Sequence, residues 1–566
     1  MNPGGAMNPG GTVSPPPPDL ILTGAEIFTD GVVPGWAEAM AVSAGRITAV
    51  GDAAEVLELA GPQTDVRDLA GRPVFPGFID AHVHPLSGGT DLLRCALHDL
   101  GTAAEYAGAI SRYAAEHPER PWIEGGGWSM DAFERGVPSA AQLDAVTGDR
   151  PAILANRDGH TAWVNTAALG LAGITGSTPD PADGRIERDE RGQPSGALHE
   201  GAMALVGRLV PEPTAEFRAE ALLAAQQYLH SLGITGWQDA HVHADPDDAA
   251  VYLQLLQSGQ LTSRVVGAQW FDRGRGADQL PEFIERRKSG SADLFRQTSI
   301  KVMLDGVCET HTAALSAPYL DHQGQPTGNT GISFFADDDL REYVRLLDEA
   351  GFQVHFHAVG DRATTQALDA VQAALAANGP RHNRHHIAHV QVVAPQDVPR
   401  FRRLGVTVNA QPLWARLEPQ MTRLTLPFLG PDRGGWQYRF GDFENAGVPT
   451  AFGSDWPVST PDPFRELHVA VNRTPAPDKT SWSPADGVFL PEQRLSLLSA
   501  VRAFTLGSAY VNHAEELAGS LAAGKSADFI VLDRNPFDGP PGDIWRTAVQ
   551  QTWFAGQPVY QREPAA

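Results

Sequence analysis

Short apolar segments broken by glycine and aspartate mark both ends of the chain. They are typical of β-strands joined by tight turns, and they lie at Leu20–Thr23, Ala39–Val42, Arg46–Val50, Asp528–Leu532, Val549–Phe554 and Pro558–Tyr560. We expect the two ends to combine in one small β-domain of residues 19–73 and 515–566. The proline-rich segment before it, residues 1–18, is expected to be a disordered tail.

Between the ends, eight apolar or alternating runs recur, separated mostly by helical stretches rich in alanine, leucine, glutamate and arginine. The runs are Val74–His84, Gly233–Asp239, Ser263–Phe271, Ser299–Asp305, Gln353–Val359, His385–Val390, Val406–Gln411 and Thr450–Asp455. Asp338–Ala350 and Arg362–Ala377 are two of the helical stretches. This alternation predicts an α/β fold, a (β/α)8 TIM-like barrel over residues 74–514.

One gap, from His84 to Gly233, is far longer than a crossover needs. We therefore predict an inserted subdomain at roughly residues 90–230, after barrel strand 1. No run of about 18 apolar residues occurs in the sequence, and its first residues show no signal-peptide pattern. A cytoplasmic location is therefore the default expectation.

The chain has 566 residues, with 43 Lys and Arg against 68 Asp and Glu, so its formal net charge is −25. Long-range repulsion of phosphates argues against any general affinity for nucleic acid or anionic membranes. Two cysteines, Cys95 and Cys308, are expected to be free thiols, as is usual in a reducing compartment. The 19 histidines are the unusual component.

The first barrel run ends in two histidines separated by one residue. Side chains two apart in a strand share a face, so His82 and His84 point the same way and suit a metal ion. A hydrogen-bonded pair is the alternative. The letters DAHVH recur at residues 239–243, but there His241 and His243 fall in the loop beyond the expected strand end, and we favour the first pair as ligands.

Four later strands bring further candidates to the same end of the barrel, the rim formed by the C-terminal ends of its strands. Alternation points Lys301 into the barrel, where an ammonium is costly unless its pKa falls or it gains a partner. Reaction with carbon dioxide would give an anionic carbamate able to bridge two cations. His357, His389 and Asp455 lie at strand ends, where barrel active sites are found. Taken alone, Lys301 has the alternative of a surface lysine at a strand end, and Asp455 has the alternative of a cap or turn residue. Nearby histidines are given structural roles: His355, His385 and His386.

Together these motifs resemble the amidohydrolase superfamily, in particular the amidohydrolase 3 branch that includes N-substituted formamide deformylases. The matching segments are PGFIDAHVH (76–84), IKVMLDG (300–306), VHFHAVGDRA (354–363), HHIAHVQ (385–391), GSDWPV (453–458) and GSLAAGKSADF (519–529). The resemblance implies that the metal ligands are His82, His84, Lys301, His357, His389 and Asp455. Many relatives have a glutamate before the sixth-strand histidine, where this chain has Ala388.

The resemblance also implies that the terminal β-domain is a composite β-sandwich, and it makes Trp128 and His160 of the insertion candidate substrate-binding residues. One or two divalent transition metal ions would bind, with zinc favoured over iron, manganese or cobalt. Asp455 would act as general base and then as general acid. Relatives of this architecture commonly form dimers, so a homodimer is a further expectation.

The implied function is hydrolysis of an amide-type C–N bond in a small molecule, an N-formyl, N-acyl or cyclic amide, by metal-activated water. Two alternatives stay open. The same metal site could serve ester or lactone hydrolysis, decarboxylation or isomerisation, or the chain could be a non-catalytic regulatory protein on this fold. The fold alone does not determine the substrate.

Overall fold

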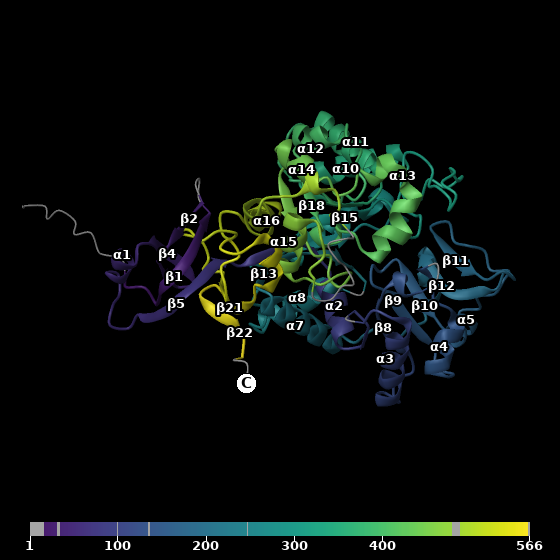
Figure 1. Cartoon of the computed structure of the whole chain (residues 1–566), viewed down its shortest axis with the longest axis horizontal. Coiled ribbons are helices and arrows are strands. Elements are labelled where there is room, and N and C mark those ends of the chain that lie inside the picture. Colours follow the sequence, from purple (N-terminus) through teal and green to yellow (C-terminus); the bar gives the residue numbers. More distant parts are fainter. Residues whose placement is uncertain are drawn as a thin grey trace, which may run out of the picture.

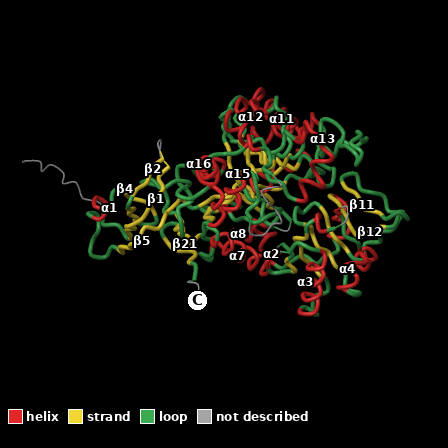
Figure 2. The backbone as a smooth tube through the Cα atoms, viewed as in Figure 1, coloured by secondary structure: helices red, strands yellow, loops and turns green. Residues whose placement is uncertain are grey.

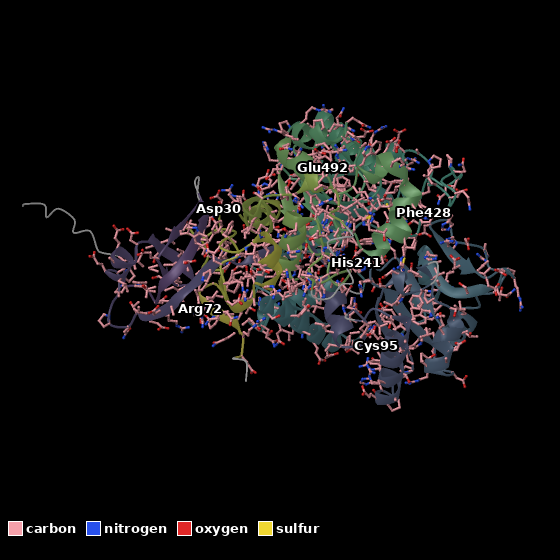
Figure 3. The ribbon with its side chains drawn as sticks, in the orientation of Figure 1. Asp30, Arg72, Cys95, His241, Phe428 and Glu492 are labelled. Carbon is pink, nitrogen blue, oxygen red and sulfur yellow. The ribbon has the colours of Figure 1, made fainter. Side chains whose placement is uncertain are left out.

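The computed structural model describes residues 16–30, 34–98, 100–133, 136–245, 247–477 and 487–563. Most of the tail expected at residues 1–18 therefore lies outside the described residues. Among the helices described, none is both long enough and apolar enough to cross a membrane. Both cysteines are buried free thiols, and Figure 3 places Cys95 in the inserted region.

A barrel of parallel strands forms the centre of the molecule (Figure 1). Its strands, in spatial order, are β6 (Phe78–Val83), β13 (Ile234–Val242), β14 (Arg264–Trp270), β15 (Phe295–Met303), β16 (Gln353–Ala358), β17 (His386–His389), β18 (Thr407–Ala410) and β19 (Thr450–Phe452). Past the strand ends, the Asp455 N–H donates to His82 O at 2.7 Å and the His84 N–H donates to Trp456 O at 2.9 Å. These bonds nearly close the ring and confirm the predicted TIM-like α/β barrel.

Helices cover the outside of the barrel (Figure 2). They include α7 (Ala215–Ser231), α8 (Asp248–Gln257), α9 (Leu280–Ser289), α10 (Asp337–Glu349), α11 (Asp361–Asn378), α12 (Val398–Leu404), α13 (Leu426–Gly434), α14 (Phe440–Asn445), α15 (Pro463–Asn472), α16 (Leu497–Arg502) and α17 (Ser508–Val511). Val344 of α10 and Val371 of α11 share one apolar cluster with Val354 and Phe356 of β16. Strands buried on both faces are typical of parallel sheets covered by helices.

The two termini meet in one mixed sheet beside the barrel. Its strands are β1 (Leu20–Asp30), β2 (Pro34–Ala37), β3 (Ala39–Ser43), β4 (Arg46–Gly51), β5 (Asp65–Pro76), β20 (Phe529–Leu532), β21 (Val549–Phe554) and β22 (Gln557–Gln561), with α1 (Ala53–Leu57) alongside. N-terminal β5 pairs antiparallel with C-terminal β20. The expected sandwich is thus one continuous hydrogen-bonded sheet built from both termini.

Another mixed sheet is inserted between β6 and β13 and lies at the opposite side of the barrel from the terminal sheet (Figure 1). Its strands are β7 (Cys95–Ala96), β8 (Ile123–Trp128), β9 (Ala152–Asn156), β10 (Thr161–Val164), β11 (Gly184–Arg188) and β12 (Pro194–Glu200). The helices of this region are α2 (Pro85–Leu92), α3 (Ala103–Glu116), α4 (Ala140–Thr147), α5 (Thr166–Leu171) and α6 (Ala204–Gly207).

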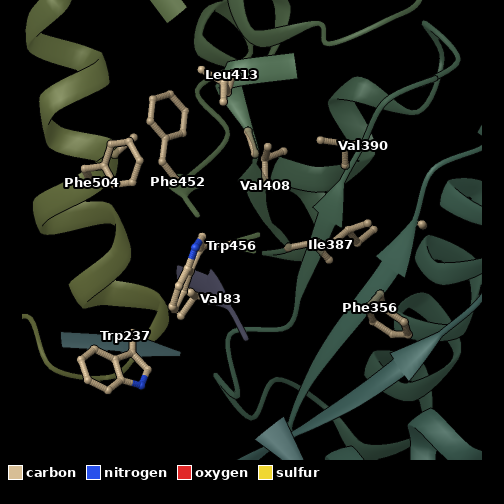
Figure 4. Close-up of a cluster of buried hydrophobic side chains, with 14 of the residues drawn as sticks. Val83, Trp237, Phe356, Ile387, Val390, Val408, Leu413, Phe452, Trp456 and Phe504 are labelled. Atoms are coloured by element: carbon tan, nitrogen blue, oxygen red, sulfur yellow. The ribbon is translucent and has the colours of Figure 1, made fainter. Parts of the chain in front are cut away.

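Large apolar side chains fill the space between the barrel strands and the surrounding helices (Figure 4). Trp237, Phe356 and Phe452 are fully buried, and the ring of Phe452 meets that of Phe504 edge-on at a centroid distance of 5.3 Å. A densely packed interior tolerates little displacement of its side chains. It therefore holds the strand ends, and the polar residues on them, in fixed positions.

His230 joins three parts of this scaffold. It lies on α7 and is 2% exposed. Its Nδ1 lies 3.0 Å from Ile234 O and its Nε2 lies 3.0 Å from Thr262 Oγ1, while Thr552 Oγ1 of the terminal sheet donates to its carbonyl oxygen. Nδ1 must donate to a carbonyl oxygen, and in the neutral ring Nε2 then accepts from the Thr262 hydroxyl.

Burial lowers the pKa of His230 to about 4, although the Ile234 hydrogen bond opposes the change. At acidic pH the unfolded chain therefore binds a proton at His230 that the folded chain does not bind. The free energy of unfolding falls as the pH falls from about 6.5 through 4. We expect this residue to account for about 3 kcal/mol of that loss. Urea unfolding of His230→Gln at pH 7 and pH 4.5 should show a smaller acid loss than wild type. The exposed His382→Gln is the control, and equal losses in all three proteins would contradict the prediction.

Candidate metal centre and active-site cavity

Three buried donors converge at one end of the barrel. His82 lies in β6, His389 ends β17 and Asp455 follows β19. One ligand atom from each lies within 4.8 Å of the others, with His82 Nε2 at 3.1 Å from Asp455 Oδ1. His389 Nδ1 is buried without a hydrogen-bond partner among the described residues and lies 3.9 Å from Asp455 Oδ2. A buried imidazole and carboxylate set with an unsatisfied nitrogen fits a divalent cation.

The other three predicted ligands surround this cluster. His84 Nε2 lies 2.9 Å from Asp455 Oδ1, and Lys301 Nζ of β15 lies 3.2 Å from His82 Nε2. The ring of His357, on β16, lies 4.4 Å from that of His389 between centroids. The barrel therefore brings all six predicted residues to one rim, and within the part of the chain that the structure describes, His82, His389 and Asp455 make the compact group.

A carboxyl group below the rim fixes the first and last strands relative to each other. Asp80 accepts hydrogen bonds from the His82 and Ser454 N–H groups, each at 3.0 Å, and from Ser454 Oγ at 2.5 Å. Gly453 allows the close approach, because a Cβ there would lie 2.4 Å from His82 N. Asp80 thus places His82 and Asp455 side by side.

Two of the compact group have unusual backbone conformations. His389 has a φ of 76° and Asp455 has a φ of 56°. Residues other than glycine adopt this region at a cost of about 1–3 kcal/mol, and they do so most often at functional sites. The surrounding hydrogen bonds hold them there, including that from the His389 N–H to Gln411 Oε1 at 2.8 Å.

The electrostatics of the rim favour metal-ready protonation states. Burial and then the Lys301 charge lower the pKa of His82 to about 3, and burial holds the pKa of His389 well below its ordinary value. Burial opposes ionisation of Asp455, but its electrostatic interaction with His82 and the hydrogen bonds from the His82 and His84 rings outweigh it and keep the pKa of this carboxyl well below its usual range. Neutral imidazoles and an ionised carboxylate are the forms in which these side chains bind metal.

Lys301 is buried in the same rim. Burial lowers the pKa of its ammonium to about 8, although the negative charges of Asp455 and Asp239 oppose the change. Near neutral pH, the Lys301 side chain is therefore a neutral, nucleophilic amine in an appreciable fraction of the molecules.

The three histidines that were given structural roles have buried hydrogen-bond partners. His355 Nε2 lies 2.8 Å from His82 Nδ1 and so orients that ring. His385 Nε2 lies 3.1 Å from Asp348 Oδ1. His386 is the first residue of β17, and its Nε2 lies 3.0 Å from Gln238 Oε1.

The second DAHVH segment differs from its prediction. β13 continues to Val242, so His241 lies within the strand, and His243 directly follows it. The expected loop was wrong because parallel pairing carries on past the apolar pattern, with Val242 opposite Gln269 of β14. Both imidazoles line the cavity described below, and Figure 3 shows His241 near the centre of the molecule. His241 lies 5.8 Å from His84 between ring centroids.

A cavity of about 830 Å³ opens over the rim and is lined by both the barrel and the insertion. Its volume suits a small molecule. Both residues taken as substrate-binding candidates line it. Trp128 is nevertheless fully buried, and its indole N–H donates to Leu154 O, so it contributes only apolar wall. Among the residues that the structure describes, the His160 ring is hydrogen-bonded through its Nδ1 alone, which lies 2.9 Å from Glu200 Oε2.

Sequence reasoning missed two carboxyl groups that organise the cavity wall. Asp305 accepts hydrogen bonds from the N–H groups of Ala314, Val359 and Gly360, and so fixes the loops after β15 and β16. Glu200 pairs with His160. Asp305 directly follows the predicted ligand strand segment 301–304 and could have been noticed there. No local pattern marks Glu200, because its partner His160 lies 40 residues away.

Comparison with known proteins decides the family. The Amidohydro_3 model of the amidohydrolase family matches residues 65–560. The chain belongs to the amidohydrolase family. This amidohydrolase is 31% identical to the protein LONG AFTER FAR-RED 3 of Arabidopsis thaliana, over 96% of this chain and 91% of that protein. It is 28% identical to N-substituted formamide deformylase of Arthrobacter pascens, over 96% of this chain and 98% of that enzyme.

Among solved structures, an uncharacterized metal-dependent hydrolase from Pyrococcus horikoshii matches with a TM-score of 0.71 and 24% sequence identity. The match covers 92% of this amidohydrolase and 99% of that chain. The likeness shows the shared fold.

Proposed function

We propose that this amidohydrolase is a metal-dependent enzyme that cleaves an amide-type C–N bond of a small molecule, with an N-formyl, N-acyl or cyclic amide as substrate. The observation that carries the proposal is the convergence of His82, His389 and Asp455 within 4.8 Å at the floor of a molecule-sized cavity. Similarity to an N-substituted formamide deformylase over nearly the whole chain supports the amide chemistry.

The donor set favours zinc, and one or two ions would be held by His82, His84, Lys301, His357, His389 and Asp455. When bound, such an ion acidifies water and polarises a carbonyl group. We further propose that Lys301 carries a carboxyl group. Its neutral amine would add to the carbon of CO₂ with loss of one proton, giving an anionic carbamate that can bridge two cations.

Asp455 is the proposed proton carrier. It is buried at the rim and ionised at neutral pH, so it can accept a proton from the water that attacks the substrate carbonyl carbon. It can then return that proton to the amide nitrogen as the C–N bond breaks, which makes the amine a neutral leaving group. His82 and His84, at 3.1 and 2.9 Å from its Oδ1, hold the carboxylate in place.

The test is hydrolysis of a panel of N-formyl amines, N-acyl amino acids, hydantoin-like rings, esters and lactones. The chain is assayed as purified, after removal of metal with a chelator, and after zinc is added back. We expect turnover of an amide, loss of that turnover on chelation, and recovery with zinc. Turnover of the esters or lactones alone would show that the site serves ester or lactone hydrolysis instead. Amide turnover that the chelator does not change would contradict a metal-dependent reaction.

A further inference from the structure

Within the described chain, one wall of the cavity carries two carboxyl groups that pair with no arginine or lysine. Glu309 lies in the loop after β15 and Asp158 in the turn between β9 and β10, and both line the cavity. Glu309 Oε1 accepts a hydrogen bond from Thr425 Oγ1 at 2.9 Å, and Asp158 Oδ1 accepts one from the His160 N–H at 2.9 Å. Neither of these contacts supplies a positive charge.

The negative charges of these two carboxyl groups act on each other. Burial and then the charge of Asp158 raise the pKa of Glu309, as expected where like charges meet in a poorly solvated place. The neighbouring Glu418 differs, because Arg416 donates to its Oε2 from Nε at 3.2 Å and from Nη2 at 2.8 Å. A positively charged group between Glu309 and Asp158 would replace their repulsion by two attractions.

A buried tyrosine hydroxyl lies on the same wall. Tyr438 is 2% exposed and lines the cavity, and among the described residues its hydroxyl has no hydrogen-bond partner. Burial and then the charge of Glu309 raise the pKa of Tyr438 well above its ordinary value, so the hydroxyl lies near that carboxyl group. A buried hydroxyl without a partner costs free energy, and we therefore expect a ligand to bond to it.

The backbone of Tyr438 is held firmly in place. Its φ of 47° lies in the left-handed region, its N–H donates to Gln391 O at 2.8 Å, and its carbonyl oxygen accepts from Arg473 Nη1 at 3.1 Å. Arg473 is fully buried and lies 5.4 Å from the ring centroid of Phe440 and 5.3 Å from that of Phe489. A strained residue held by several contacts is typical of a functional position.

This wall lies within the reach of a small molecule from the candidate metal centre. Gly306 O lies 3.4 Å from His357 Nε2. Glu309 follows Gly306 by three residues, so their Cα atoms are at most about 11 Å apart. A substrate with its amide group at the metal centre can therefore extend a short chain to Glu309.

We infer that the amine part of the substrate carries a second, protonated nitrogen, which Glu309 and Asp158 bind by charge and Tyr438 binds by a hydrogen bond. The inference rests on the proposed function, because it takes the amide group to lie at the candidate metal centre. An ammonium group has three N–H donors, and the two carboxylates and the Tyr438 oxygen supply three acceptors. The substrate class is thus the mono-acyl derivative of a diamine.

Two formamides of equal length test the role of the ammonium group. The mono-N-formyl derivative of diaminobutane ends in an ammonium group where N-formylpentylamine ends in a methyl group. The zinc-loaded protein should prefer the first in kcat/KM. Glu309→Gln should reduce that preference at least about tenfold, as expected for loss of a charge-assisted hydrogen bond, and the loss should appear as a higher KM for the diamine derivative.

Two milder variants test the other members of the wall. Tyr438→Phe removes a hydroxyl that bonds to no described residue, and Asp158→Asn keeps the Oδ1 atom that accepts the His160 N–H. Both should lower the preference, by less than Glu309→Gln does. Glu212→Gln is the matched control, because Glu212 also lines the cavity but is exposed, and its preference should equal that of wild type.

Calorimetric titration with pentylamine hydrochloride tests the same wall without any turnover. Its affinity should fall at least about tenfold in Glu309→Gln, and pentanol, its neutral counterpart, should bind more weakly than pentylamine to wild type. Equal pentylamine affinity in wild type and Glu309→Gln would overturn the inference, and so would a wild type with no preference for the diamine derivative. If the panel gives no amide turnover while pentylamine affinity still depends on Glu309, the proposed function fails and the cation site stands.

Discussion

Replacing Asp455 with asparagine is expected to lower kcat for the amide substrate roughly thousandfold, in line with the usual contribution of a positioned acid–base group. Asparagine keeps the size of the side chain and one oxygen, but it cannot accept and return a proton at neutral pH. His82 and His389 remain, so the metal content should change little. Steady-state kinetics together with metal analysis of the same preparation measure both effects.

Asp338→Asn is the control, because Asp338 is an exposed aspartate on α10 whose side chain is 95% exposed. It should leave kcat and metal content at the wild-type level. If Asp455→Asn turns over substrate as fast as wild type, Asp455 has no acid–base role. A variant that loses both metal and activity would show that Asp455 acts chiefly as a ligand.

The second large effect is expected on stability, from Asp80→Ala. Asp80 is fully buried and accepts from two backbone N–H groups and the Ser454 hydroxyl. Alanine leaves three donors unsatisfied at about 1–3 kcal/mol each. Since such terms are not additive, we expect the free energy of unfolding to fall by about 4 kcal/mol, seen as a lower urea midpoint.

Ser454→Ala is the comparison, because it removes the hydroxyl donor and leaves the two N–H groups bonded to Asp80. Its midpoint should lie between those of wild type and Asp80→Ala. A midpoint for Asp80→Ala equal to that of wild type would show that the junction between the first and last barrel strands does not depend on this carboxyl group.

The sequence predicted the rim because strand geometry is local. Side chains alternate with a period of two, so His82 and His84 share a face whatever the rest of the chain does. The C-terminal ends of parallel strands meet at one end of a barrel, which brings His389 and Asp455 to the same place. Neither the alternation of side chains nor the common end of the strands depends on contacts between particular distant residues.

The positions that the sequence did not reveal, or placed wrongly, depend on contacts that no local pattern contains. Asp80 finds Ser454 across 374 residues, and Glu200 finds Thr312 across 112. The length of β13 is set by pairing with its neighbours, so the apolar pattern ended before the strand did, and His241 was placed in a loop. The strands of the insertion were not predicted individually, because β7 and β10 are short and turn residues interrupt the segment.

The central claim is that His82, His389 and Asp455 hold a catalytic metal ion. Anomalous X-ray diffraction from crystals of the purified protein, collected on both sides of the zinc absorption edge, tests it most directly. We expect an anomalous peak between these three side chains and extra density joined to Lys301 Nζ where a carbamate would lie. A map with no anomalous peak at this rim and with an unmodified Lys301 would show that these side chains do not hold a metal ion.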